Sequence, residues 1–378
     1  MKIIFLSRLL YLTGVSTHMR DLGSELVRMG HSVTILTAGS QFKDDEACRV
    51  LEKSIRDAGI IVETIPFPRT SKNSVFFYLQ MIKPLWLTRS FLKRNKYDVI
   101  HVHTPSMSLV PKLLGYKFVS TTHIAKMELN RFSATEEIAV SKEIYDDLVK
   151  RRIPAEHISL INNGVSSSFI FSQKGGEGDK LPQGINCFSN LTRILFVGTL
   201  CYRKGLDILC KAVSNLPEKT KNKIQVIFIG DYDSLDSKIW LEGIIEDYDL
   251  KHIITVLGYR DPHKYYWASD IFVLPSRLEG FPLVSIEAMM GHCCLIMSNI
   301  EGADVQVIDG ETGFVFQNEN VIQLRNIIDR VVNSKDLQKK IADAGQEYAI
   351  EHFSSERMAR QTIDVYYKVA CNSNYCIS

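Results

Sequence analysis

Two glutamates eight residues apart, Glu279 and Glu287, are the side chains whose type and spacing most suggest chemistry. They are the first and last residues of the segment E-G-F-P-L-V-S-I-E. This segment comes after the apolar run 271–274, which is typical of a buried parallel strand. Pro282 suits the first position of a helix, where a missing N–H costs nothing. The carboxylate of Glu279 is therefore expected in a loop, and that of Glu287 between one and two turns inside a helix. Free backbone N–H groups, at the positive end of the helix dipole, are expected between the two carboxylates.

This arrangement suits a ligand that carries a diphosphate and two sets of hydroxyl groups, as a nucleotide-sugar does. Spacing alone is weak evidence, because most glutamate pairs on a helix and its approach are solvated surface charges. A second group strengthens it: Arg203, Lys204 and Gly205 follow another apolar run, 193–198. Two cations beside a glycine at a helix start suit an anionic leaving group, although a solvated basic turn is the commoner fate of such a triplet.

The first half of the chain offers a glycine and several histidines. Gly14 follows the first expected strand, where a glycine lets backbone approach a phosphate, although a simple turn explains it equally well. No G-x-G-x-x-G loop is present, which disfavours dinucleotide binding. His123 is expected at the carboxyl tip of a strand, facing a crevice. His101 and His103 share one face of a strand, but without a third ligand they are predicted to pack or to line the cleft rather than to bind a metal.

Strand and helix patterns alternate in both halves, which predicts an α/β chain of two doubly wound parallel sheets. The expected strands are 3–6, 33–37, 60–65, 99–103, 118–122, 137–140, 158–161, 193–198, 224–229, 253–257, 271–274 and 294–297, and the clearest helices are 16–29, 321–332, 336–350 and 355–370. A stretch rich in Ser, Gly and Pro, 166–190, is the expected linker between an N-terminal domain, 1–165, and a C-terminal domain, 191–354. In such sheets ligands bind beyond the carboxyl ends of the strands, where all the candidate residues are expected.

Composition narrows the class of protein. The 378 residues are 45% hydrophobic and 23% charged with a net charge of +2, so nothing indicates a nucleic-acid partner. Eight cysteines without C-x-x-C spacing favour reduced thiols, and hence a cytoplasmic protein. The apolar run within residues 1–6 is interrupted by Ser7 and Arg8 and precedes no cleavage site, which predicts a buried strand rather than a signal peptide. No run of 18 apolar residues predicts a membrane span.

One basic segment leaves two interpretations open. Residues 69–96 contain seven Lys or Arg and no acid, with Phe76, Phe77, Tyr78 and Trp86 interleaved. This composition suits an amphipathic element resting on an anionic membrane, such as the inner face of the cytoplasmic membrane. An ordinary helix with a solvated basic face explains it as well.

Taken together, the motifs resemble the retaining glycosyltransferases of family four, and the resemblance spans nearly the whole chain. It is carried by T-G-V-S-T-H-M-R-D-L from Thr13, D-V-I-H-V-H-T-P from Asp98, T-T-H from Thr121, I-N-N-G-V from Ile161, F-V-G-T-L-C-Y-R-K-G from Phe196, E-G-F-P-L-V-S-I-E from Glu279 and D-G-E-T-G-F from Asp309. The resemblance implies the GT-B fold, in which two Rossmann-like domains face each other across a cleft. It also implies that the C-terminal helix, 355–378, crosses back onto the N-terminal domain.

The resemblance also implies roles for individual residues. Lys204, with Arg203, would neutralise the donor diphosphate, and Glu287 would bind the ribose hydroxyls. Glu279 would hold the hydroxyls of the donor sugar, and the backbone around it would come from Gly280, Phe281, Pro282 and Leu283. In the N-terminal domain, Gly14 would lie near the diphosphate and the acceptor, and His123 would contact the donor sugar. Glu279, Lys204 and His123 are therefore the expected catalytic residues.

The implied activity is transfer of a sugar from a nucleotide-diphosphate sugar, with a UDP-sugar preferred, to a hydroxyl of a glycan or lipid-linked acceptor in surface polysaccharide or glycoconjugate synthesis. It is of the hexosyltransferase type, retains the anomeric configuration, and needs neither a metal nor another cofactor. A sugar-nucleotide epimerase of the same fold and a non-catalytic GT-B scaffold remain alternatives. The sequence departs from the family pattern at Thr13, which replaces a first glycine, at Thr199, where an arginine is frequent, and at Asp304, which stands where a P-E pair is usual.

Overall fold

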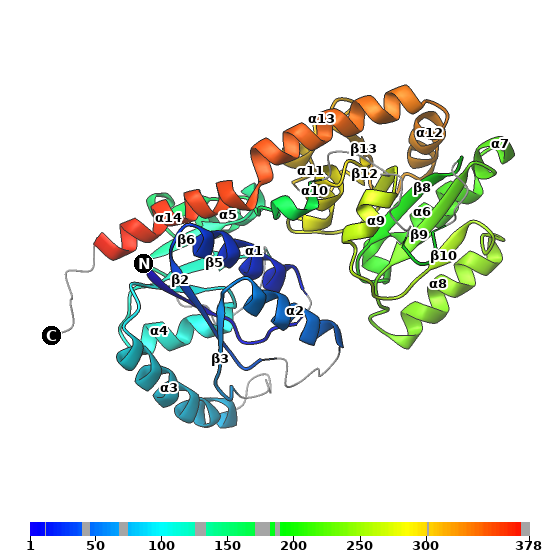
Figure 1. Cartoon of the computed structure of the whole chain (residues 1–378). Helices are drawn as coiled ribbons and strands as arrows, with labels where there is room; N and C mark the ends of the chain where they lie inside the picture. The colour runs from blue at the N-terminus through cyan, green and yellow to red at the C-terminus, as the bar shows by residue number, and fades with distance from the viewer. Residues whose placement is uncertain are drawn as a thin grey trace. The chain divides into compact units, whose positions relative to one another are not determined.

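The chain forms two compact units (Figure 1). One unit comprises Met1–Gly164 with Ser355–Ser378, and the other comprises Val165–Ser354, so the chain passes between them at residues 164–165 and 354–355. The computed structural model describes residues 1–11, 13–39, 46–67, 75–124, 134–170, 182–185, 190–300 and 302–371.

The first unit is a parallel sheet of seven strands in the order β3-β2-β1-β4-β5-β6-β7. The strands are β1 (Lys2–Leu6), β2 (Ser32–Thr37), β3 (Ile61–Thr64), β4 (Val99–Val102), β5 (Val119–Thr122), β6 (Glu136–Ala139) and β7 (Ile158–Leu160). The helices are α1 (Gly14–Arg28), α2 (Glu46–Asp57), α3 (Val75–Asn95), α4 (Leu109–Leu113), α5 (Lys142–Lys150) and α14 (Ser355–Cys371), with short 3-10 turns η1 (Pro105–Ser108) and η2 (Ala155–His157).

Both faces of this sheet carry a hydrophobic cluster, and its central strand β1 is accordingly an almost continuous apolar run. Along β1 the side chains alternate, so Ile3 and Phe5 join the hydrophobic cluster that contains α1 and α14. Ile4 and Leu6 join a separate cluster on the opposite face, together with residues of α3 and α4.

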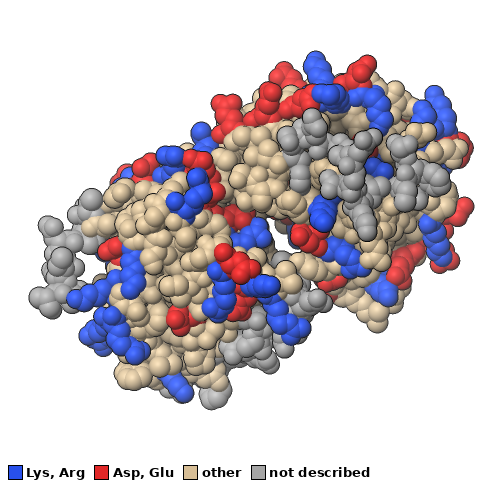
Figure 2. All heavy atoms as spheres, viewed as in Figure 1, with Lys and Arg blue, Asp and Glu red and all other residues tan. Residues whose placement is uncertain are grey.

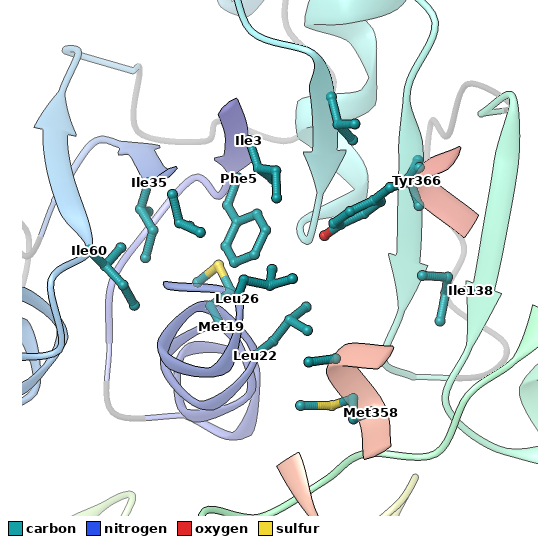
Figure 3. Packing of buried hydrophobic residues seen from close by; sticks show 14 of the residues in the cluster. Ile3, Phe5, Met19, Leu22, Leu26, Ile35, Ile60, Ile138, Met358 and Tyr366 are labelled. Atoms are coloured by element: carbon teal, nitrogen blue, oxygen red, sulfur yellow. The ribbon is translucent and has the colours of Figure 1, made fainter. Parts of the chain in front are cut away.

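Helix α14, from the far end of the chain, completes the first cluster (Figure 3). Met358 and Tyr366 are buried in the same cluster as Phe5 and Leu22, and Figure 3 shows the Tyr366 ring pointing toward the side chains of the sheet and α1. The Tyr366 hydroxyl is 2.7 Å from His101 Nδ1. The expected return of the C-terminal helix to the N-terminal unit is therefore present.

The second unit is a parallel sheet of six strands in the order β10-β9-β8-β11-β12-β13. The strands are β8 (Thr192–Val197), β9 (Ile224–Ile229), β10 (Ile254–Val256), β11 (Ile271–Leu274), β12 (Cys294–Ser298) and β13 (Phe314–Phe316). The helices are α6 (Leu206–Ser214), α7 (Glu218–Lys221), α8 (Leu235–Asp247), α9 (His263–Ala268), α10 (Leu283–Met290), α11 (Ala303–Gln306), α12 (Val321–Val332) and α13 (Lys335–Phe353), with 3-10 turns η3 (Ser167–Phe169) and η4 (Tyr202–Lys204).

All twelve expected strands are present with ends shifted by one residue at most, and the doubly wound prediction is confirmed. Strand β13, Phe314–Phe316, was not predicted. The predicted helix 16–29 begins two residues earlier, at Gly14, since the helix extends into the T-G-V loop.

The described ends of the predicted linker, 166–190, belong to the second unit. Phe169 packs on the Tyr266 ring with 5.9 Å between ring centroids. Gln225 donates a hydrogen bond of 2.8 Å to the carbonyl of Gly184, and the Tyr265 hydroxyl donates one of 3.0 Å to Gln183. Residues 171–181 and 186–189 lie outside the described part of the chain.

Each sheet has one point where its strand order reverses, between β1 and β4 in the first unit and between β8 and β11 in the second. The loops that leave the carboxyl ends of these two strands run in opposite directions and open a crevice between them, which is where ligands bind in sheets of this kind. In the second unit these loops approach very closely at Gly205, whose φ is +68°. A Cβ on Gly205 would lie 1.9 Å from the carbonyl oxygen of Pro275, so only glycine fits.

Charged side chains are mixed over the surface. On the face shown in Figure 2, Lys and Arg are interspersed with Asp and Glu among neutral residues, and no field of a single sign dominates the described residues there. This agrees with the small net charge of +2. The five cysteines described as free, Cys48, Cys201, Cys210, Cys293 and Cys294, are all buried.

Tyr366→Ala should destabilise the first unit by about 3–5 kcal/mol, because it removes a fully buried aromatic ring from the α14 contact. Tyr367→Ala is the matched control, since Tyr367 is 52% exposed, and it should change stability by less than about 0.5 kcal/mol. Urea unfolding followed by circular dichroism measures both. Equal midpoints for the two variants would contradict the packing described for α14.

Gly205→Ala should destabilise the second unit by at least about 2 kcal/mol, because the new methyl group meets the Pro275 carbonyl and the backbone is left-handed. Gly14→Ala provides the comparison, since a Cβ at Gly14 meets nothing within 4 Å, and its unfolding free energy should stay within about 0.5 kcal/mol of wild type. If Gly205→Ala proves as stable as Gly14→Ala in denaturant titrations, the two loops are not held as closely as described.

Candidate functional site

The reversal point of the second sheet brings Arg203, Lys204 and Glu279 together. Lys204 Nζ lies 2.5 Å from Glu279 Oε1, and Arg203 donates to Glu279 Oε2 at 3.2 Å. Arg203 and Lys204 lie on η4 after β8, whereas Glu279 lies in the loop after β11, so 75 residues of sequence separate the lysine from the carboxylate. Arg203, Lys204 and Glu279, which sequence analysis selected for their charges, therefore form one cluster in space.

Glu279 is held ionised by its neighbours. Burial would by itself raise the pKa of Glu279, but the charge and hydrogen bond of Lys204, together with Arg203 and Ser276, outweigh burial and lower the pKa below its ordinary value of 4.5. The ion pair therefore stabilises the fold above the ordinary pKa, and this stabilisation is lost as the pH falls through the lowered value. At neutral pH the cluster offers a carboxylate that accepts hydrogen bonds from hydroxyls and two cations that attract an anion.

A second ion-pair network fixes the loops that carry this cluster. Arg277 donates from its two terminal nitrogens to Asp207, at 2.8 and 3.0 Å, and also to both carboxylate oxygens of Glu319. The Arg277 guanidinium stacks on the Tyr202 ring at 3.8 Å from its centroid, and its backbone N–H donates to the Arg203 carbonyl. Burial would by itself raise the pKa of Asp207, but Arg277 lowers it. Sequence analysis did not identify Arg277, although an arginine two residues before Glu279 was a visible signal.

The predicted backbone around Glu279 leads into α10. Pro282 is the N-cap of this helix and Leu283 its first residue, so the expected position of Pro282 is shifted by one. The Pro282 carbonyl accepts hydrogen bonds from Ser285 Oγ at 2.7 Å and from Gln306 Nε2 at 3.1 Å. Phe281 is buried and packs edge-on against Phe353. The loop 279–282 is thus fixed at the helix end where backbone N–H groups face outward from the helix.

Glu287 lies deeper on the same helix. It is buried, and its Oε2 accepts a hydrogen bond of 2.8 Å from the hydroxyl of Tyr266, a residue of α9. Burial, and then the adjacent Glu287 charge, raise the pKa of Tyr266, so this tyrosine keeps its proton and remains a donor. The second glutamate of the pair therefore has a structural partner that the sequence did not reveal.

The reversal point of the first sheet holds a cavity of about 250 Å³. Its walls come from the loops after β1, β4 and β5, from the start of α1 and from α5. His123 and His103 line it, and so do Thr13 and Val15 on either side of Gly14. Gly14 is itself the exposed first residue of α1. The two N-terminal residues that sequence analysis selected thus lie at or beside one cavity.

Histidines gather beneath this cavity. His18 from α1 lies with its ring centroid 5.4 Å from that of His103 and 4.8 Å from that of His123. His101 and His103 share a face of the sheet, as expected, with ring centroids 4.0 Å apart. Burial lowers the pKa of His18 to about 4 and holds the pKa of the other three well below the ordinary value, so all four rings are neutral at pH 7.

His18 corrects the expectation that no third ligand accompanies the strand histidines. One nitrogen each of His18, His103 and His123 lies within 4.8 Å of the others, a spacing from which three imidazoles could hold a metal ion. Sequence analysis missed His18 because only the position of α1 over the sheet brings it to β4 and β5. The available signal was its place on the buried face of α1, one turn after Gly14.

Comparisons with known proteins agree with this architecture. The family described as Glycosyltransferase Family 4 matches residues 12–169, and the family described as Glycosyl transferases group 1 matches residues 179–348. An uncharacterized glycosyltransferase of Methanocaldococcus jannaschii is 30% identical over 73% of this chain and 70% of its own. The UDP-Gal:alpha-D-GlcNAc-diphosphoundecaprenol alpha-1,3-galactosyltransferase of Escherichia coli is 26% identical over 68% of this chain and 72% of its own.

Among solved structures, Anabaena HepE in complex with UDP-glucose is similar in fold, with a TM-score of 0.80 at 21% identity over 97% of this chain and 100% of that one. Both units are Rossmann-like, the two family profiles together extend over most of the sequence, and a relative at 30% identity covers most of it as well. The chain therefore belongs to glycosyltransferase family four, within the group 1 glycosyltransferases of GT-B fold, and is a transferase that acts on sugars.

Proposed function

We propose that this enzyme transfers a sugar from a UDP-sugar to a hydroxyl of a glycan or lipid-linked acceptor, with retention of the anomeric configuration. The observation that carries the donor part is the cluster of Arg203, Lys204 and Glu279 at the reversal point of the second sheet. Cations beside a helix start suit a diphosphate, and an ionised carboxylate suits sugar hydroxyls. The names of the galactosyltransferase relative and of the HepE complex support a UDP-sugar.

The proposed reaction breaks the bond between the anomeric carbon and the diphosphate oxygen and forms a bond from that carbon to the acceptor oxygen. The acceptor hydroxyl proton leaves with the departing diphosphate. Lys204 and Arg203 stabilise the negative charge that develops on the diphosphate. Among the described residues of this cluster, Glu279 is the one carboxylate beside the cations, and we propose that it binds sugar hydroxyls. We therefore propose that the acceptor hydroxyl attacks the anomeric carbon from the face that the nucleotide leaves, without a covalent intermediate on the enzyme.

The two positive side chains take the part that a divalent cation plays in other transferases, so we propose transfer without a metal or another cofactor. The family resemblance supports contact between His123 and the donor sugar. Glu287 is proposed to bind the ribose hydroxyls, with Tyr266 donating a hydrogen bond to its Oε2.

Two alternative functions differ in what they predict. A sugar-nucleotide epimerase would convert the donor into its epimer without any acceptor, and a non-catalytic scaffold would neither bind nor hydrolyse donors. A thermal-shift screen of nucleotide-sugars, followed by analysis of the products, distinguishes these two functions from a transferase. The screen detects donor binding, because a bound donor stabilises the native unit. The ionised Glu279 beside two cations favours the transferase over the scaffold.

A face of α3 favours a lipid-linked acceptor held at a membrane. Ile82 and Trp86 are 61% and 67% exposed, and with Arg89 and Lys93 they recur at the spacing of one helical face. Lys83 is exposed beside them. Apolar side chains flanked by cations suit the surface of an anionic bilayer, and we propose that α3 contacts one on the cytoplasmic side. Residues 69–74 of the basic segment lie outside the described part of the chain, and no described helix is both long and apolar enough to cross a bilayer.

Lys204→Ala should lower kcat/KM for sugar transfer about 100-fold or more, the scale of one lost transition-state donor. Lys251→Ala is the control, because Lys251 is exposed and pairs only with Glu246 among the contacts described for its side chain. Initial rates with the best donor from the thermal-shift screen measure both. Turnover near wild type in Lys204→Ala would remove this residue from the mechanism.

Glu287→Gln and Tyr266→Phe together test whether Glu287 binds the ribose of the nucleotide. If the carboxylate binds ribose, calorimetry with UDP alone should show weaker binding in Glu287→Gln and less change in Tyr266→Phe. Unchanged UDP affinity in a folded Glu287→Gln variant would leave the glutamate with a structural role only.

Replacing Lys83, Arg89 and Lys93 together by Gln should weaken binding to phosphatidylglycerol vesicles about 100-fold, since each cation near an anionic surface contributes about 1 kcal/mol. The control replaces Lys219, Lys251 and Lys340, exposed lysines of the second unit, by Gln. Vesicle co-sedimentation measures binding. A similar loss in both triple variants, or in neither, would contradict a membrane-binding face on α3.

A further inference from the structure

Three imidazoles from three separate elements converge beneath the cavity of the first unit. His18 comes from α1, His103 follows β4 and His123 follows β5, and a nitrogen of each lies within 4.8 Å of the others. The distances between ring centroids are 4.8, 5.4 and 5.8 Å. The proposed transfer uses only His123, so the other two have no assigned chemistry.

The ring spacing matches that of three histidines on one tetrahedral metal ion. A Zn–N bond of about 2.0–2.1 Å places the ring centroids about 3.2 Å from the metal, and hence about 5.2 Å from one another. The observed distances lie on both sides of that value. On one tetrahedral ion the three nitrogens would lie about 3.3 Å apart, so binding requires the rings to turn toward one another from their present spacing of up to 4.8 Å.

The ring nitrogens are available as ligands. Both nitrogens of His103 and Nε2 of His123 are buried without a hydrogen-bond partner in the described part of the chain, and the nitrogens of His18 are buried with only the side chain of Asn163 close enough to interact. His18 is 3% and His103 1% exposed. Unpaired buried nitrogens are uncommon and call for an explanation such as a bound ion. His101 differs, because its nitrogens already contact Tyr366 and Thr121.

The ligand set selects the class of ion. Imidazole suits zinc and its neighbours, whereas magnesium and calcium require oxygen ligands, and no carboxylate belongs to the cluster. The neutral state of the rings is the state that binds a metal. His103 and His123 also line the cavity, so a fourth position would open into it. An open position is typical of zinc sites that exchange a ligand.

We propose that His18, His103 and His123 form a site for a borderline divalent cation such as Zn²⁺, and that its occupation blocks sugar transfer. The blocking part rests on the proposed function, because it requires His123 to act on the donor sugar. The binding part does not depend on it. The cation is an inhibitor in this proposal, so it agrees with transfer that needs no metal.

The test uses the full chain after chelator treatment. Calorimetry with ZnCl₂ should show one equivalent bound, and Co²⁺ should give the intense visible absorption of a tetrahedral complex. His18→Gln and His103→Gln should each weaken Zn²⁺ binding at least about 10-fold. His252→Gln, which removes an exposed imidazole elsewhere, should bind as wild type does. Circular dichroism verifies folding, and His123→Gln replaces any variant that does not fold.

Zn²⁺ affinity that is the same in the folded cluster variants and in wild type would overturn the site, as would the weak absorption of octahedral Co²⁺ in wild type. In the transfer assay, Zn²⁺ should abolish activity and chelator should restore it. Transfer that continues with the site filled would overturn the blocking. If no sugar is transferred under any condition, the proposed function fails, while calorimetry and the cobalt spectrum still decide the metal site.

Discussion

The close approach of the loops that follow β8 and β11 is the constraint on which the second unit depends. Gly205 permits it, since any Cβ there would meet the Pro275 carbonyl, and Arg277 maintains it through Asp207, Glu319 and the Tyr202 ring. Because these loops touch, Lys204 from one and Glu279 from the other meet at 10% exposure each, with most of their water removed, while Arg203 joins them from a half-exposed position. An ion pair in that setting is stronger than at an exposed surface, and removal of one partner is correspondingly costly.

The first unit uses the same architecture for different chemistry. Its reversal point also opens a cavity at the carboxyl ends of the strands, but the groups that converge there are neutral imidazoles rather than opposed charges. Helix α14 contributes indirectly, because the Tyr366 hydroxyl is hydrogen-bonded to Nδ1 of His101 and the Tyr366 ring is part of the hydrophobic core of this unit. Tyr366, near the end of the chain, thus supports a cavity lined by residues between Ser7 and Arg151.

Family membership and chemical detail rest on different observations. The sequence profiles and relatives establish a family four glycosyltransferase of GT-B fold. The donor, the retention of configuration and the acceptor are proposals argued from charge, burial and the exposed face of α3. The structure adds a partner for Glu287 in Tyr266, and it adds His18 to the histidines, which the family resemblance had not singled out.

The sequence by itself determined twelve of the thirteen described strands, the two doubly wound sheets, and Arg203, Lys204 and Glu279 as candidate residues, because apolar runs and helix boundaries are local signals. Arg203, Lys204 and Glu279 were identifiable as chemistry-bearing groups, since each follows such a run. Only the tertiary structure decided that they touch, that Arg277 fixes their loops and that His18 joins His103 and His123. Those contacts join elements far apart in the chain, and such pairings depend on strand order and helix packing, which no local pattern encodes.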